Sequence, residues 1–149
     1  MTPELAVIPC GAAKRPGNHP ARQLYTGSYF RAGLRWAIAI RADRILILSA
    51  KHGLVELDQR LDTYDLTFGQ PGAVTVDDVA AQARQFGLLD ATPVVCAGGK
   101  RYRGIVRKIW PHATSPVDGL PSMGAHLSHL TRAARRAEAG NRLSAKDAS

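Results

Sequence analysis

Apolar residues occur along the chain in short unbroken runs that alternate with segments of helical spacing. Unbroken runs cover residues 5–10, 44–49 and 93–96, and each predicts a buried strand. A weaker run at residues 113–116 predicts a fourth strand. Strands with no polar alternation are typical of parallel sheets, because helices cover both faces of such a sheet.

Four further segments place apolar residues at intervals of three and four positions, as on one face of a helix. They predict helices over residues 28–40, 75–86, 102–109 and 124–138. Thr75 and Asp78 have the spacing of a capping box, which supports a helix start at that point.

Two intervening segments, residues 11–24 and 54–74, are rich in glycine, proline and charged side chains, so we expect long loops there. Strands alternating with helices predict an α/β fold, here a three-layer α/β/α sandwich with a short, mainly parallel sheet. A chain of 149 residues fits one domain, which we place at residues 1–139. We expect residues 140–149 to form a flexible basic and polar tail.

Composition narrows the class of protein. Met1 is not followed by the basic and apolar pattern of a leader, and no apolar run approaches the ~20 residues of a membrane helix, so we expect a soluble cytoplasmic protein. Cys10 and Cys96 do not make a disulfide framework, and no Cys/His group has zinc spacing. We therefore expect neither a membrane partner nor a metal or cofactor, and the oligomeric state stays open.

Positive charge is concentrated in the two ends of the chain. The net charge is +8, and residues 1–50 and 100–149 are basic whereas residues 51–99 are acidic. A fold that joins the ends presents a basic face suited to nucleic acid, although a basic surface of no specific role is the alternative. The candidate phosphate contacts are Arg103, Arg132, Arg135 and Arg136.

Each predicted central strand ends in small or polar residues. In parallel α/β sheets, ligands bind beyond the carboxyl ends of the strands, and small residues let them approach the backbone. These strand ends are therefore the candidate site: Cys10 and Gly11, then Ser49 to Gly53, then Ala97 to Lys100.

The side chains at these ends allow several kinds of chemistry. His52 suits general acid–base catalysis and Lys51 the stabilisation of an anion, whereas a structural turn is the alternative for both. Asp65 is a candidate base or orienting group for His52, and Tyr64 a stacking platform, unless the pair forms a structural corner. Cys10 is either a nucleophile activated by His52 or an inert buried thiol.

Gly98, Gly99 and Lys100 lie between a predicted strand and a predicted helix. Backbone N–H groups at a helix start, with a lysine beside them, suit a phosphate or another anion. The segment lacks the P-loop and Rossmann frames, and a tight turn that needs glycine for its geometry is an equally good interpretation.

Four motifs together resemble a family of small, largely uncharacterised bacterial and phage proteins. They are Ile8 to Lys14, Leu24 to Gly27, Ser49 to Leu54 and Tyr64 to Leu66, which match the pattern SCSKxK…LYTG…LSAKHGLL…YDxxL. The stretch from Ser49 to Leu66 is also distantly similar to the YaaA peroxide-stress family, which is associated with DNA binding and protection. The chain departs from the pattern at Pro9, Gly11 and Ala12, and retains Lys14.

The resemblance implies a nucleobase, nucleotide or nucleic-acid context without supplying a reaction. One hypothesis is a strand-end pocket for a nucleobase, nucleoside or nucleotide, with hydrolysis or transfer at an N-glycosidic bond. Asp65 would stabilise the sugar cation or activate water, His52 or Lys51 would assist the leaving base, and Gly98 to Lys100 would hold a phosphate. The other ligand contacts would be Cys10, Gly11, Lys14, Tyr25, Ser49 and Tyr64. The alternative hypothesis is a non-catalytic DNA-binding protein that uses its basic face, which comprises residues 100–142 together with Arg15, Arg22, Arg31 and Arg35.

Overall fold

A four-stranded sheet forms the centre of the protein in the computed structural model, which describes residues 2–148. The strand order is β4-β3-β1-β6, where β1 (Leu5–Pro9) pairs in parallel with β3 (Arg44–Ser49) and with β6 (Val94–Cys96). The edge strand β4 (Gly53–Glu56) runs antiparallel to β3. The predicted α/β fold with a mainly parallel sheet is thus confirmed.

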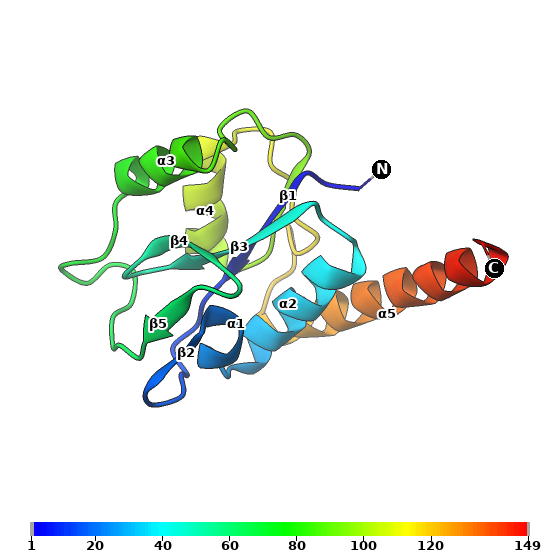
Figure 1. Cartoon of the computed structure of the whole chain (residues 1–149), viewed down its shortest axis with the longest axis horizontal. Helices are drawn as coiled ribbons and strands as arrows, with labels where there is room; N and C mark the ends of the chain where they lie inside the picture. The colour runs from blue at the N-terminus through cyan, green and yellow to red at the C-terminus, as the bar shows by residue number, and fades with distance from the viewer. Residues whose placement is uncertain (1, 149) are drawn as a thin grey trace.

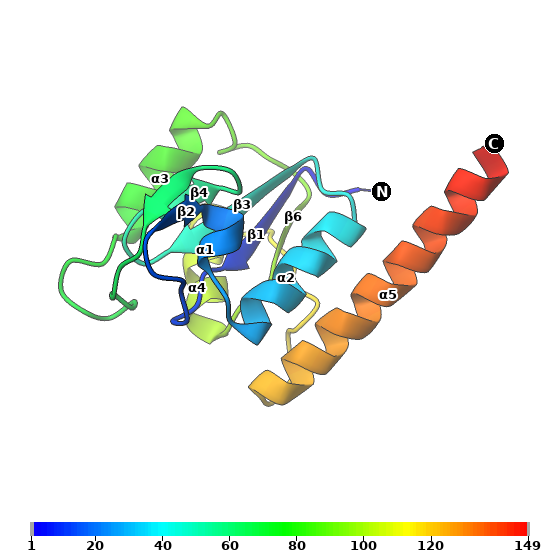
Figure 2. The same cartoon turned by 60° about the horizontal axis from the view of Figure 1, so that its bottom comes forward.

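Helices cover both faces of this sheet (Figure 1). On one face α2 (Ser28–Ala39) packs against β1, with the long helix α5 (Met123–Ala148) lying along α2. On the other face lie α3 (Val76–Gln85) and α4 (Lys100–Ile109). Figure 2 shows that α5 continues beyond the end of α2 and away from the sheet.

Successive residues of β1 enter opposite cores, which explains why its sequence shows no polar alternation. Ala6 and Ile8 join the core under α2 and α5, whereas Leu5 and Val7 join the core under α3 and α4. All four side chains are at most 1 % exposed. Each face of the strand therefore contributes to the hydrophobic stabilisation of one helical layer.

The predicted loops contain short regular elements. Within residues 11–24 the structure has β2 (Asn18–Pro20) and α1 (Ala21–Leu24), and within residues 54–74 it has most of β4 and all of β5 (Arg60–Asp62). β2 pairs with β5 in a separate two-stranded sheet. Segments of three or four residues are too short to show a hydrophobic period, so the sequence pattern missed them.

Larger differences from the sequence prediction lie in the C-terminal part of the chain. The run at residues 113–116 forms an isolated bridge, between Thr114 and Val95, in place of a strand. α5 does not end at Glu138 but continues to Ala148, so residues 140–148 are helical where we expected a flexible tail. Asn141 explains part of this extension, because its side-chain amide donates to the carbonyl of Ala39 at the end of α2.

Along the described helices, none is long and apolar enough to cross a membrane.

Candidate functional site

The parallel strands β1, β3 and β6 end at the same edge of the sheet. Cys10 and Gly11 follow β1, Ser49 closes β3, and Gly98 and Gly99 follow β6 before α4 begins at Lys100. Chain segments that are far apart in sequence therefore bring their small and polar residues to one place. Parallel α/β sheets bind ligands at this edge.

A cleft of about 340 Å³ opens at this edge. Cys10 and Gly11 line it from β1, Tyr29 and Phe30 from the start of α2, and Tyr102 from α4. Its remaining lining residues are Pro9, Ala12, Gly27, Ser28, Gly99, Met123 and Leu127. The lining is mainly apolar and aromatic and includes no acidic side chain among the described residues, so the cleft suits a flat, largely uncharged group.

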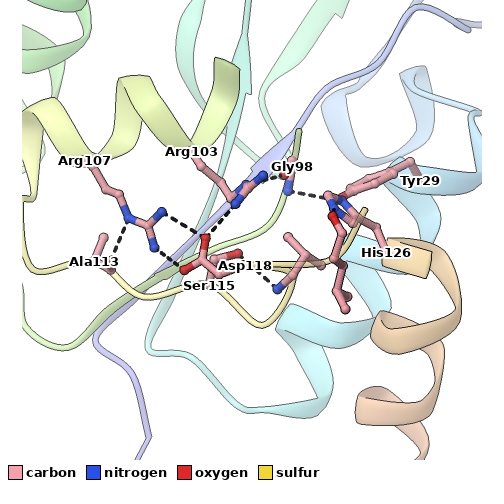
Figure 3. A network of polar contacts seen from close by, with 10 residues as sticks. Tyr29, Gly98, Arg103, Arg107, Ala113, Ser115, Asp118 and His126 are labelled. Atoms are coloured by element: carbon pink, nitrogen blue, oxygen red, sulfur yellow. Dashed lines mark hydrogen bonds and ion pairs between the residues drawn. The ribbon is translucent and has the colours of Figure 1, made fainter. Parts of the chain in front are cut away.

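Gly98 follows β6, and both its backbone N–H and its backbone carbonyl are hydrogen-bonded to side chains (Figure 3). Its N–H donates to the hydroxyl of Tyr29 at 3.2 Å, and its carbonyl accepts from Nε of Arg103 at 3.1 Å. Gly98 has a φ of +126°, and a Cβ there would lie 2.8 Å from Cβ of Tyr102. Glycine is therefore required both by the backbone conformation and by the close approach of α4.

Arg103 is occupied within the fold. Its Nη1 donates to Oδ1 of Asp118 at 2.6 Å, and Arg107 pairs with the same carboxylate (Figure 3). Hydrogen bonding from Arg107, followed by that from Arg103, lowers the pKa of Asp118 to about 2. The guanidinium of Arg103 thus holds Gly98 and Asp118 within the fold, and its contact with a nucleic-acid phosphate stays a prediction.

Three hydroxyl groups form a chain at the end of β3, from residues that are not part of the cleft lining. The Ser49 hydroxyl is fully buried and accepts the backbone N–H groups of Lys51 and His52. Its own proton is then directed to Tyr64 Oη, at 2.7 Å, and Tyr64 Oη lies 2.6 Å from Tyr25 Oη. Burial raises the pKa of both tyrosines, so both hydroxyls stay protonated.

Two lysines and a histidine surround the ring of Tyr64. Lys14 Nζ lies 4.3 Å from the ring centroid and Lys51 Nζ 5.8 Å from it, both within cation–π range. The His52 ring meets the Tyr64 ring edge to face at a centroid distance of 5.3 Å. Burial, followed by the charge of Lys51, lowers the pKa of His52. His52 is therefore mostly neutral at pH 7.

The remaining predicted site residues lie outside these contacts. Asp65 is exposed and makes no hydrogen bond or ion pair with another described residue, so the structure does not join it to His52. Cys10 is buried, its Sγ lies 3.3 Å from the Tyr102 hydroxyl, and among the described residues it makes no hydrogen bond with His52. Lys100 is exposed at the start of α4. Arg132, Arg135 and Arg136 are exposed on α5.

Across residues 2–148, no group of three His, Cys, Asp or Glu side chains is arranged to hold a metal.

Sequence reasoning missed Tyr29, Tyr102 and His126 as members of the site. His126 is 5 % exposed and joins α5 to Tyr29 through Nδ1, at 2.7 Å. A signal existed, because His126 falls four and eight positions before Leu130 and Ala134, on the apolar face of its helix. A buried histidine requires a hydrogen-bond partner, and that partner was not identifiable without the fold.

Comparisons with known proteins give the chain relatives without a known activity. A family model described as a family of unknown function, DUF6884, matches residues 5–132. The uncharacterised protein YfjM of Bacillus subtilis is 33 % identical over 141 residues, which cover 87 % of this chain and 93 % of the relative. No solved structure matches the chain.

Proposed function

The chain belongs to the DUF6884 family of unknown function, and we propose that it binds a nucleobase-containing small molecule at the carboxyl edge of its sheet. The observation that carries this proposal is the cleft between Tyr29, Phe30 and Tyr102. A nucleobase is flat, with apolar faces and polar edges, and the cleft offers aromatic walls together with two glycines, Gly11 and Gly99.

A second hollow, of about 280 Å³, adjoins the cleft at Met123 and is lined by Lys100 and Arg103. A base in the cleft would leave its sugar substituent facing this hollow, where the Lys100 ammonium suits a phosphate. We therefore favour a nucleoside or nucleotide over a free base. The distant resemblance of Ser49 to Leu66 to a DNA-associated family supports the same class of ligand.

The lining of the cleft supports the binding of such a ligand better than it supports a reaction on it. Cleavage of an N-glycosidic bond stays a prediction, because the cleft lining has no carboxylate among the described residues and Asp65 lies exposed on its loop. An Asp65→Asn variant tests it: the predicted role requires that turnover of a bound nucleoside is lost while binding is retained. Unchanged turnover in that variant would overturn the role.

The test of binding compares two neighbouring alanines. Ala12 and Ala13 are both exposed, but Ala12 lines the cleft and Ala13 does not. We expect Ala12→Trp to fill the cleft and Ala13→Trp to leave it open. In a thermal-shift panel of bases, nucleosides and nucleotides, a ligand at a hundred times its Kd stabilises the wild type by about 2.7 kcal/mol. That stabilisation should vanish in Ala12→Trp and persist in Ala13→Trp.

Lys100 tests the phosphate part of the same site. Lys100→Gln should weaken binding of a nucleotide and leave the matching nucleoside unaffected, whereas Lys108→Gln, further along α4, should change neither. Stabilisation by no member of the panel, or equal loss in both tryptophan variants, would contradict the proposal.

A further inference from the structure

A groove of about 600 Å³, which differs from the cleft, is lined by α2, by residues between Arg15 and Tyr25, and by the later turns of α5. The two share Phe30 alone among their lining residues. Five guanidinium groups line the groove. One comes from the loop before β2, one from α1, two from α2 and one from the turn that follows α2. These are Arg15, Arg22, Arg31, Arg35 and Arg41.

Acidic side chains balance this charge only in part. Glu138 of α5 is the acidic residue within the described lining, and Arg35 Nη2 pairs with it at 2.7 Å. Arg22 pairs with Asp58 outside the lining, at 2.9 Å. Over residues 2–148, Arg31 and Arg41 have no acidic partner. The groove therefore keeps an excess of positive charge.

Arg41 has an unusual backbone for its residue type. Its φ is +57°, the left-handed conformation in which glycine or asparagine usually follows a helix end. An arginine there costs backbone energy that glycine would avoid. Strain of this kind is retained where the side chain has a role, and the Arg41 side chain lines the groove.

The floor of the groove is aliphatic. Leu34, Ile38 and Ala39 of α2 form it, and Ile38 is 51 % exposed. A floor of this kind gives apolar contact to a ligand whose charges are spaced along its rim. Guanidinium groups match phosphate oxygens with paired hydrogen bonds.

We propose that this arginine groove binds the phosphate backbone of a nucleic-acid strand. Phosphodiesters repeat along a strand, which fits cations spread over one groove, and sugars and bases provide the apolar surfaces that its floor requires. The contact is to the backbone, so we expect little dependence on base sequence. The proposal is independent of the ligand in the cleft.

The experiment measures anisotropy of a labelled 20-nucleotide DNA strand, of the RNA strand of the same sequence and of the duplex, at several salt concentrations. We compare the wild type with Arg31→Gln/Arg41→Gln. The matched control is Arg84→Gln/Lys108→Gln, which removes two exposed charges from α3 and α4 on the other face of the sheet. An acidic polypeptide, poly-glutamate of similar charge, serves as competitor.

We expect the groove variant to lower the slope of log affinity against log salt by about two, one for each lost phosphate contact. The control variant should keep the wild-type slope, and Ala12→Trp should bind the strand as the wild type does. No binding by the wild type, an equal change in both double variants, or competition by poly-glutamate at the same charge concentration would each overturn the proposal. If Ala12→Trp loses nucleoside binding but still binds the strand, the first result concerns the cleft and the second supports the groove.

Discussion

Tyr29 donates its hydroxyl proton to Nδ1 of His126, across 2.7 Å between α2 and α5 (Figure 3). The direction follows from the other ring nitrogen, because Nε2 of His126 lies 3.3 Å from the carbonyl of Leu120, and a carbonyl only accepts. The same hydroxyl accepts the backbone N–H of Gly98. One tyrosine therefore joins the end of β6 to both helices on the opposite side of the cleft.

Removing this hydroxyl should cost stability. Tyr29→Phe leaves the buried Nδ1 of His126 and the N–H of Gly98 without a partner, and we expect a loss of about 1–3 kcal/mol in the free energy of unfolding. Urea denaturation measures it. Tyr102→Phe is the control, because the partners of its hydroxyl are the Cys10 thiol, which bonds weakly, and the backbone of Gly11, which is exposed to water. Equal losses in the two variants would contradict the special role of Tyr29.

Ser49 gives a second stability prediction, at the end of β3. Its buried hydroxyl accepts two backbone N–H groups and meets Tyr64, so Ser49→Ala should lower the free energy of unfolding by about 1–3 kcal/mol. Ser128→Ala, at an exposed position of α5, should change it by less than about 0.5 kcal/mol. A urea titration in which Ser49→Ala matches Ser128→Ala would show that the turn is held by other contacts.

The contrast between these elements shows what the sequence predicts and what it leaves open. β1 and β3 are unbroken apolar runs because both faces are buried, so the parallel sheet and its covering helices follow from the pattern alone. The location of the site at the strand ends follows from the same topology. β5, with three residues, has no such pattern.

The walls of the site depend on contacts that no local pattern encodes. Tyr29 and His126 are 97 positions apart, and Cys10 and Tyr102 are 92 positions apart. Their pairing is decided by how α2, α4 and α5 pack around the sheet. Asp65 shows the converse, because its neighbours in sequence made it a candidate while the loop leaves it exposed.

Asp118 should make stability depend on pH under acidic conditions. Its pKa falls from the usual 3.8 to about 2 in the folded protein, because Arg107 and then Arg103 hydrogen-bond the carboxylate. The stabilisation is therefore complete above about pH 4 and is lost as the pH falls through about 2. Asp118→Asn should be less stable than the wild type at pH 6, and the difference should shrink toward pH 2. A difference that is constant over this range in urea titrations would exclude a charge effect.

The two thiols should differ in reactivity. Cys96 is fully buried, and burial raises its pKa to about 11, so little thiolate forms at pH 8. Cys10 is also buried, at 3 % exposed, but it lines the cleft, through which a reagent would reach it. We expect iodoacetamide to label Cys10 well before Cys96 in the folded protein, as located by peptide mass spectrometry. A ligand in the cleft should slow the labelling of Cys10, and equal labelling of the two thiols would contradict this placement.

Alanine substitutions at Gly98 and Gly11 distinguish the cost of backbone strain from the cost of crowding between the new Cβ and α4. Both have positive φ, +126° and +110°, so an alanine at either position is strained by about 1–3 kcal/mol. A Cβ at Gly11 meets no atom within 4 Å, whereas one at Gly98 lies 2.8 Å from Cβ of Tyr102. Gly98→Ala should therefore lose more stability in urea than Gly11→Ala, because α4 must move away from the strand end. That movement displaces Tyr102, a wall of the cleft, so Gly98→Ala should also weaken ligand binding beyond what Gly11→Ala does. Equal effects of the two substitutions on stability would show that α4 yields freely and that the close contact does not fix the wall.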